Sequence, residues 1–268
     1  EGMARALGQP VVADTRPGAD GAIAVRAGVA AEADGYTLVL VAASMFALPM
    51  AVKPPPFDVA DLVPISTLGD LTFGLFVPAS LPVKTTRELL AYAKAQSQPL
   101  AYASISLSMD ALTSAVADAG GVTMTRVPYK GGGQAMTDLI GGRLQVFLGP
   151  IGNGMPGVQE GRLRLLATHP DRSPLAPDVP TLAESGVGAV TTPMFMLVAA
   201  PARTPRAIVD RLAQAVEAAL REPAVRARLE SLGISPQPSS PEQAAEKVRL
   251  ALSAYAPVIR RLAEAGGN

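Results

Sequence analysis

Short apolar runs rich in β-branched residues alternate with longer stretches of helical periodicity along most of the chain. Helical patterns lie around 22–31 and at 85–96, where Thr85 and Glu88 have the spacing of a capping box. The runs that predict strands in this first part are 10–14 (PVVAD), 36–42 (YTLVLVA), 62–68 (LVPISTL) and 73–78 (FGLFVP). Such alternation is typical of α/β folds, in which crossover helices join mainly parallel strands.

A second series of alternating elements follows. Its predicted members are strand 100–104, helix 109–119, strand 124–129, helix 133–141, strand 144–149, a brief helix and strand 163–168. One more apolar strand, 194–201, precedes three helices that must pack on an existing sheet. We predict two lobes, each a mainly parallel sheet flanked by helices: lobe I from 1–80 and 195–268, and lobe II from 81–194. The chain then crosses between the lobes twice, which makes a hinge.

The first residues, EGMARALG, predict the last two turns of a helix, with Gly8 at its C-terminal cap. A helix of about seven residues is marginal by itself, because helices under ~12 residues are unstable in water. No charged-then-apolar leader is present, so no signal peptide is expected within this chain. We predict that the chain begins inside a βα unit and lacks the first strand of the fold.

Composition argues against several classes of function. Lys and Arg together number 23, as do Asp and Glu, which leaves no basic surface for nucleic acid or for an anionic membrane. The chain has no Cys and a single His, so we expect no metal site, no cysteine nucleophile and no cofactor. No apolar run approaches the roughly 20 residues that span a bilayer.

Seven segments together resemble one family of transport receptors. They are LGQPVVADTRPGADG, ADGYTLVL, LPVKTTRELLAYAKA, LAYAS, VPYKGGGQAMTDLIGGRLQV, RSPLAPDVPTLAESGV and APARTPRAIVDRLAQAVEAAL. In this order and spacing they are similar to the receptors of tripartite tricarboxylate transporters, the Bug family of periplasmic solute-binding proteins. The resemblance implies a two-lobed, periplasmic-binding-protein-like (type 2) fold, a cleft for a small mono-, di- or tricarboxylate or an amino acid, and delivery to integral-membrane transporter subunits.

Backbone N–H groups at helix N-termini and hydroxyls can hold a carboxylate, because neutral donors satisfy it without a buried counter-charge. The first candidate is Ser44, after strand 36–42, where ligands bind in open α/β sheets. Met45 and Phe46 would supply apolar walls beside it. The alternative for Ser44 is a helix N-cap that binds no ligand.

The second candidate segment follows strand 100–104 and contains Ser104, Ser106 and Ser108 ahead of a helix. The resemblance implies a Gly-rich stretch and often a His here, whereas this sequence has ISLSMDA, with Asp110 near that point. An acidic residue beside an anion site is unfavourable. Asp110 is therefore either a solvated residue of the first helical turn or the partner of an ammonium group on the ligand.

The third candidate segment is Lys130, Gly131, Gly132 and Gly133, which match the PYKG motif of the family. A strand followed by glycines and a helix can cradle an anion. Lys130 is either a charge partner of the ligand or a solvated lysine at a strand end. We expect Tyr129 to line the cleft.

Two positions depart from the family pattern. After strand 144–149 the family often has an Asp, sometimes followed by Asn, where this sequence has GPIGNG. The loss of that acid favours a ligand with fewer hydrogen-bond donors than an amino acid. Phe195 stands where the family commonly has a Trp, and it either covers the ligand or packs in the hinge.

Two other features mimic catalytic or nucleotide sites. The run 152–157 (GNGMPG) fits a dinucleotide fingerprint, with Asp171 about twenty residues further on, but Pro156 interrupts it and the helix that follows is too short. His169 lies in the polar run THPDRSP with no triad partner nearby in sequence, which predicts a surface histidine rather than a catalyst.

The pattern as a whole favours a non-catalytic receptor in the periplasm. We expect a monomer that binds a small carboxylate between two lobes, closes over it and presents the closed form to membrane transporter subunits, with no nucleic-acid partner. One alternative is an α/β enzyme, such as a small transferase that uses Ser44 or Lys130. Another is a ligand-sensing signalling receptor, although no DNA-binding module is present.

Overall fold

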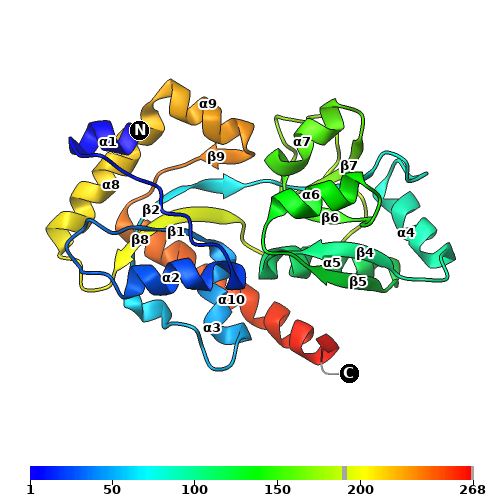
Figure 1. Cartoon of the computed structure of the whole chain (residues 1–268), viewed down its shortest axis with the longest axis horizontal. Helices are drawn as coiled ribbons and strands as arrows, with labels where there is room; N and C mark the ends of the chain where they lie inside the picture. The colour runs from blue at the N-terminus through cyan, green and yellow to red at the C-terminus, as the bar shows by residue number, and fades with distance from the viewer. Residues whose placement is uncertain (189–191, 267–268) are drawn as a thin grey trace. The chain divides into compact units, whose positions relative to one another are not determined.

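The computed structural model describes the backbone of residues 1–188 and 192–266, and the side chains of these residues up to 260. The chain forms two compact units (Figure 1), which are described separately. Unit 1 comprises Glu1–Leu71, Pro193–Glu230 and Ile234–Asn268, and unit 2 comprises Thr72–Thr192 and Ser231–Gly233. The first crossing, between Leu71 and Thr72, comes before the predicted lobe boundary at 80/81, so strand 73–78 belongs to unit 2.

Unit 1 is built on a four-stranded sheet of order β1-β8-β2-β9. Its strands are β1 (Val39–Ala42), β2 (Leu62–Leu71), β8 (Phe195–Pro201) and β9 (Ile234–Pro236). Strand β8 pairs antiparallel with both β1 and β2. Strands β1 and β2 therefore run in the same direction, with a reversed strand from much later in the chain inserted between them.

Helices cover this sheet, and the last three predicted helices are present. They are α1 (Gly2–Leu7), α2 (Ala22–Val29), α3 (Ala43–Ala51), α8 (Arg206–Arg221), α9 (Pro223–Ser231) and α10 (Pro241–Gly266), with short 3-10 turns η1 (Ala19–Gly21) and η2 (Val59–Asp61). In α8 the buried side chains of Val209, Leu212, Val216 and Leu220 recur at helical spacing and pack against Ile65 of β2. As predicted, the final helical block packs on the sheet of the first unit.

Unit 2 contains β3 (Phe73–Pro78), β4 (Leu100–Ser104), β5 (Met124–Pro128), β6 (Phe147–Pro150) and β7 (Leu163–His169). Strands β4 and β5 pair in parallel, and a parallel bridge between Tyr102 and Val146 joins β4 to the segment that leads into β6. Strand β3 pairs antiparallel with β6 and β7. The strands β4, β5, β6 and β7 therefore share one direction, and β3 alone opposes them among the described strands of this unit.

Four helices flank the strands of unit 2 in its described residues. They are α4 (Thr86–Ala95), α5 (Leu107–Gly120), α6 (Gly132–Ile140) and α7 (Ile151–Gln159). The side chain of Thr85 caps α4 by accepting a hydrogen bond from the backbone N–H of Glu88, as the spacing predicts. The Glu88 carboxylate completes only half of the expected capping box, since it accepts from the N–H of Lys84 rather than from that of Thr85.

The predicted α/β class is confirmed, but the expectation of mainly parallel pairing needs correction. In unit 2 four of the five described strands share a direction, whereas in unit 1 two strands run each way. Among the described ladders only β4 with β5 is parallel, because β8 and β9 run against β2 and β3 runs against its neighbours. The predicted strand 10–14 is wrong: these residues form no ladder, and Val12 is 84% exposed. No helix within the described part of the chain is long and apolar enough to cross a membrane.

Candidate functional site

The C-terminal ends of β4, β5 and β6 lie at one edge of unit 2, because these strands share a direction, and a helix follows each of them. The backbone N–H of Tyr129 donates to the carbonyl of Ser104 at 2.8 Å, which ties the ends of β4 and β5 together. A β-carbon added to Gly132 would be 3.0 Å from Nδ2 of Asn153. The first turns of α6 and α7 are therefore neighbours, and Asn153 is a polar group at this edge that the sequence did not single out.

The first turn of α6 is open, as expected of an anion cradle. Its N-cap, Gly131, has extended backbone that any residue can adopt, and no side chain caps the helix. A β-carbon at Gly131 or Gly133 would meet nothing within 4 Å. Lys130 is exposed and makes no ion pair within the described part of the chain. Uncapped N–H groups of this kind are free to bind water or an anion.

Tyr129 supports α6 through its hydroxyl group, which donates to Oδ2 of Asp138 at 2.7 Å. The guanidinium of Arg143 donates to the other carboxylate oxygen at 2.5 Å. The pKa of Asp138 is lowered, mainly because Tyr129 donates this hydrogen bond to its carboxylate. The pKa of Tyr129 is raised, mainly because burial disfavours its charged form. The Tyr129 hydroxyl proton is therefore used in a hydrogen bond within unit 2.

The serines after β4 differ in their surroundings. Ser104 and Ser108 are 2% and 5% exposed. The hydroxyl of Ser104 donates to Oδ2 of Asp110 at 3.0 Å. Ser106 is the N-cap of α5, and its hydroxyl oxygen accepts from the N–H of Met109 and lies 3.5 Å from the Ser108 hydroxyl. Of these three serines, Ser106 alone is partly exposed.

Asp110 is not solvated, so that interpretation is wrong. It is 7% exposed, and its Oδ2 also accepts from Nε of Arg126 at 3.0 Å, a pairing that the sequence did not reveal. Tyr102, which lies opposite Arg126 in the β4–β5 ladder, has a raised pKa because of burial and then because of the nearby Asp110 charge. Asp110 thus belongs to a polar cluster at the start of α5.

In unit 1, Ser44 lies in the first turn of α3 and is 2% exposed. The N-cap of α3 is Ala42, so the N-cap alternative for Ser44 is wrong. Met45 lies against Gly21, where a β-carbon would be 2.1 Å from the methionine methyl group. Phe46 is 1% exposed and belongs to the core rather than to a wall.

The loop that Met45 contacts is conformationally unusual. Four consecutive residues have positive φ: Gly18 (118°), Ala19 (47°), Asp20 (51°) and Gly21 (84°). Non-glycine residues in this region are strained, and such strain collects at binding sites. This run was not singled out in the sequence, although its two glycines were the available signal.

Phe195 is 1% exposed and lies opposite Asp70 across the β2–β8 ladder. The ammonium of Lys247 in α10 stands 5.0 Å from the centre of the Phe195 ring and also pairs with Asp70. All three residues belong to unit 1, where the Phe195 ring is buried beside α10.

The features that mimic other sites have structural explanations. The run 152–157 lies within α7, so its glycines are helical rather than part of a phosphate loop, which supports the rejection of a dinucleotide site. His169 is 6% exposed, and the surface interpretation is wrong. Burial lowers its pKa, and its ring makes a hydrogen bond with the backbone of Thr192. No cluster of potential metal ligands is present among the described residues.

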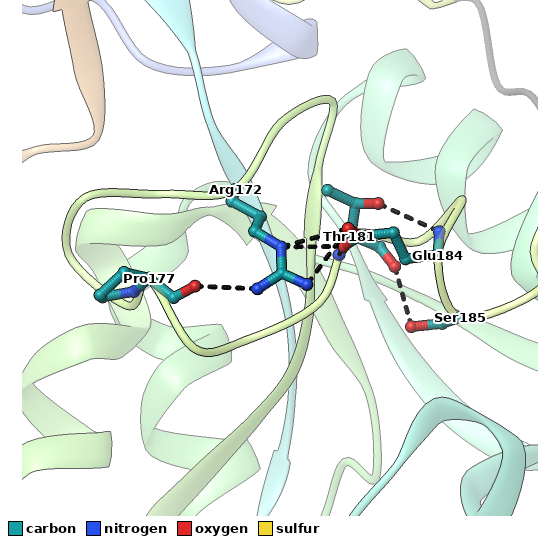
Figure 2. Close-up of polar contacts among 5 residues, drawn as sticks. All are labelled: Arg172, Pro177, Thr181, Glu184 and Ser185. Carbon is teal, nitrogen blue, oxygen red and sulfur yellow. Dashed lines mark hydrogen bonds and ion pairs between the residues drawn. The ribbon is translucent and has the colours of Figure 1, made fainter.

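The RSPLAPDVPT segment forms a loop that bonds to Glu184 and Ser185, just beyond its end (Figure 2). The guanidinium of Arg172 donates to both carboxylate oxygens of Glu184 and to the carbonyl of Pro177. The N–H of Thr181 donates to Glu184 at 2.7 Å, and the Ser185 hydroxyl donates back to the Thr181 carbonyl. The backbone of Thr168 in β7 bonds to Pro180 and Leu182 on either side of Thr181, so the loop is held both by these side chains and by β7.

Comparison with known proteins identifies the family. Residues 1–263 match the family described as "Tripartite tricarboxylate transporter family receptor". The chain belongs to this receptor family. A relative from Cupriavidus necator, described as a UPF0065 protein in the gbd 5' region, is 36% identical over 253 residues, which cover 92% of this chain and 76% of the relative.

Solved structures agree with the family assignment. An R. palustris protein solved with adipate is 29% identical, with a TM-score of 0.90 over 97% of this chain and 88% of that chain. MatC from Rhodopseudomonas palustris, solved with bound malate, is 28% identical, with a TM-score of 0.87 over 96% of this chain and 90% of that chain. The predicted resemblance and the periplasmic-binding-protein-like fold are confirmed.

Proposed function

We propose that this member of the receptor family is an extracytoplasmic solute-binding receptor. It captures a small carboxylate and delivers it to the membrane subunits of a tripartite tricarboxylate-type transporter. In the proposed complex both units contribute donors, from the first turn of α3 in unit 1 and from the first turns of α5, α6 and α7 in unit 2. The chain would act as a monomer in the periplasm.

One observation carries the proposal: the first turn of α6 is uncapped and open at the strand edge where α/β proteins bind ligands. Asn153 and the start of α7 adjoin it. Neutral donors and a helix dipole attract a carboxylate without a buried cation. Two relatives of the same fold were solved with the dicarboxylates malate and adipate, which supports this class of ligand.

The chemistry of the site favours a receptor over the transferase alternative. The single His is buried in β7 and makes a hydrogen bond with the backbone of Thr192, and no described hydrogen bond joins it to Ser44 or Lys130, the two groups proposed as nucleophiles. Nucleophilic catalysis needs an activating base within about 3 Å of the nucleophile. A receptor needs neither a nucleophile nor an activating base, so binding without turnover is the simpler function.

The test is a binding screen with recovery of the ligand. Melting temperatures are measured with malate, adipate, succinate, citrate and aspartate, and hits are quantified by calorimetry. We expect micromolar or tighter binding of at least one acid, which remains chemically unchanged after overnight incubation. Conversion of the ligand would support the enzyme, and the absence of binding to the whole panel would refute a carboxylate receptor.

Variants in each unit test the shared contribution. Ser44→Ala removes a hydroxyl at the start of α3, and Gly133→Ala adds a methyl group at the start of α6. If both units hold the ligand, each substitution weakens binding while the free protein keeps its fold. An effect confined to unit 2 would contradict the contribution of α3.

A further inference from the structure

Residues Ser231–Gly233 form a further connection between the two units, which the sequence did not predict. The chain leaves unit 1 after Glu230, contributes these three residues to unit 2 and returns to unit 1 at Ile234. Resting on the proposed function, we infer that this connection and the first turn of α7 together form a coupling element. Through it, binding of the carboxylate changes the arrangement of the two units, and Gly152 is its positioning residue.

The first step concerns the contact between the connection and α7. A β-carbon at Gly152 would be 2.7 Å from the carbonyl oxygen of Leu232 and 2.8 Å from its Cα atom. At Gly233, where φ is +78°, a β-carbon would be 2.2 Å from Cγ2 of Ile151. Backbone therefore lies on backbone at Gly152, with no side chain between that could absorb a displacement by changing its rotamer. Because packed interiors are hardly compressible, a shift of this turn is passed to the connection.

Thr72 ties the same turn of α7 to the first crossing between the units. It is the first residue of unit 2, directly after Leu71. Its backbone N–H donates to the carbonyl of Gly233 at 2.8 Å, and its own carbonyl accepts from the N–H of Ile151, the first residue of α7, at 2.9 Å. The start of α7 is thus bonded, through Thr72, to residues at two connections between the units.

The same turn of α7 adjoins the candidate carboxylate site. Asn153, next to Gly152, is exposed and lies against Gly132 in the first turn of α6, where a β-carbon would be 3.0 Å from Nδ2 of the asparagine. A carboxylate bound at these turns acts on α7 one residue away from the contact with Leu232. A ligand shifts a conformational equilibrium when it binds the two states with different affinity, and a contiguous network of contacts carries that difference.

The connection has the properties of a pivot. Its far end is fixed in unit 1, because Ile234 pairs with Leu71 in the β2–β9 ladder. The side chain of Leu232 is 38% exposed, so little packing opposes its movement. Hinges are a few residues at the ends of elements that absorb a change in φ and ψ, and Gly233 has the freedom of a glycine in the left-handed region.

Distances between the units measure the coupling. The chain contains no Cys, so spin labels on Lys94→Cys in α4 and Gln214→Cys in α8, both exposed positions, report one distance distribution by pulsed electron paramagnetic resonance. The acid among malate, adipate, succinate and citrate that binds most tightly is added at saturation. We expect different distributions for the free and the bound protein. Identical distributions would overturn the inference and leave the receptor function standing, whereas binding of none of these acids would count against both.

Two variants act on the coupling element. Gly152→Ala forces the turn away from Leu232, and Leu232→Gly turns the connection into the flexible sequence Ser-Gly-Gly. Each should leave part of the protein in its free arrangement even at saturation, and should weaken binding about fivefold or more, the lower end of usual coupling between sites. Leu232→Gly adds no atoms to the packed turn, so it keeps the inference testable if Gly152→Ala does not fold.

Gly157→Ala is the matched control. Gly157 lies in the same helix, and its β-carbon would be 2.7 Å from Cδ1 of Leu163 in β7. Overpacking should lower its melting temperature, as in Gly152→Ala, while conversion to the bound distribution stays complete. Equal loss of conversion in the two alanine variants would indicate general destabilisation and overturn the inference. Complete conversion in both Gly152→Ala and Leu232→Gly would also overturn it, because the turn would then contribute to affinity alone.

Discussion

Gly154 lies directly against the ring of Phe76: a β-carbon at this glycine would be 2.5 Å from Cε1 of the ring. Phe76 is fully buried in β3, and Gly154 is part of α7, so the missing side chain lets the helix approach the strand. The glycines of the GNGMPG run thus serve helix packing. The same run in a nucleotide-binding protein would instead leave its glycines facing a phosphate.

Gly154→Ala is therefore expected to destabilise the protein. The added methyl group cannot avoid a ring that is itself packed on all sides, and overpacking of this kind costs about 1–3 kcal/mol. Chemical denaturation monitored by circular dichroism measures the loss. A variant as stable as the parent would show that α7 can move away from β3 at little cost.

The glycines at the start of α6 should behave in the opposite way. Gly131→Ala and Gly133→Ala place a methyl group in open space on backbone that alanine can adopt, so each should stabilise the free protein by about 0.4–1 kcal/mol. If a carboxylate docks on this turn, the same methyl group obstructs it, and affinity should fall by about tenfold or more.

Gly188→Ala is the control for these variants. Gly188 is also in unit 2 with nothing within 4 Å of a β-carbon, and it lies outside the proposed site. We expect it to leave affinity unchanged. Melting temperature and calorimetry on the same samples separate the two effects, and unchanged affinity in both α6 variants would place the ligand elsewhere.

Most of the elements that could be predicted from the sequence are those that depend on residues close to them along the chain. The strand 100–104, the N-cap at Thr85 and the glycine-rich start of α6 each depend on neighbours a few residues away, and each is present in the structure. The insertion of β8 between β1 and β2 could not be predicted in this way, because the pairing joins residues more than a hundred positions apart. No local pattern encodes which strand will stand between two others.

The errors at individual residues have a similar origin. The run 10–14 has strand-like residues, but a strand also needs a ladder partner, and these residues have none in the described structure. Asp110 resembled a solvated residue because its partner Arg126 lies in another element, and His169 resembled a surface residue because its polar sequence neighbours concealed its burial. Burial and charge pairing are tertiary properties, so a charged residue in a polar run is where sequence reasoning fails most easily.

Lys247→Met tests the contact between α10 and the β2–β8 ladder. Methionine keeps an apolar chain near Phe195 but removes the charge that faces the ring and Asp70. Both charged partners are partly exposed, so the expected loss of stability is only about 0.5–1 kcal/mol, and it should shrink in high salt. The control is Lys84→Met, an exposed lysine whose side chain has no partner in the described structure. An equal effect of both variants would show that the ring contact contributes nothing.

The lowered pKa of His169 predicts how the free energy of unfolding depends on pH. Burial lowers the pKa of its imidazole in the folded protein below the ordinary value of about 6.5. The unfolded chain therefore takes up a proton first as the pH falls, and the free energy of unfolding should decrease between about pH 6.5 and the lower folded pKa. Carboxylates whose pKa is lowered, such as Asp138, destabilise the fold only at more acidic pH, below about 4.

Denaturation midpoints between pH 7.5 and 5 measure this dependence, and His169→Asn should flatten it in that range. Because the chain contains a single His, one imidazole resonance in a proton NMR titration reports its pKa without assignment. A resonance that titrates at or above about 6.5 would contradict the effect of burial. A steep pH dependence that persists in His169→Asn would instead locate its cause in another group.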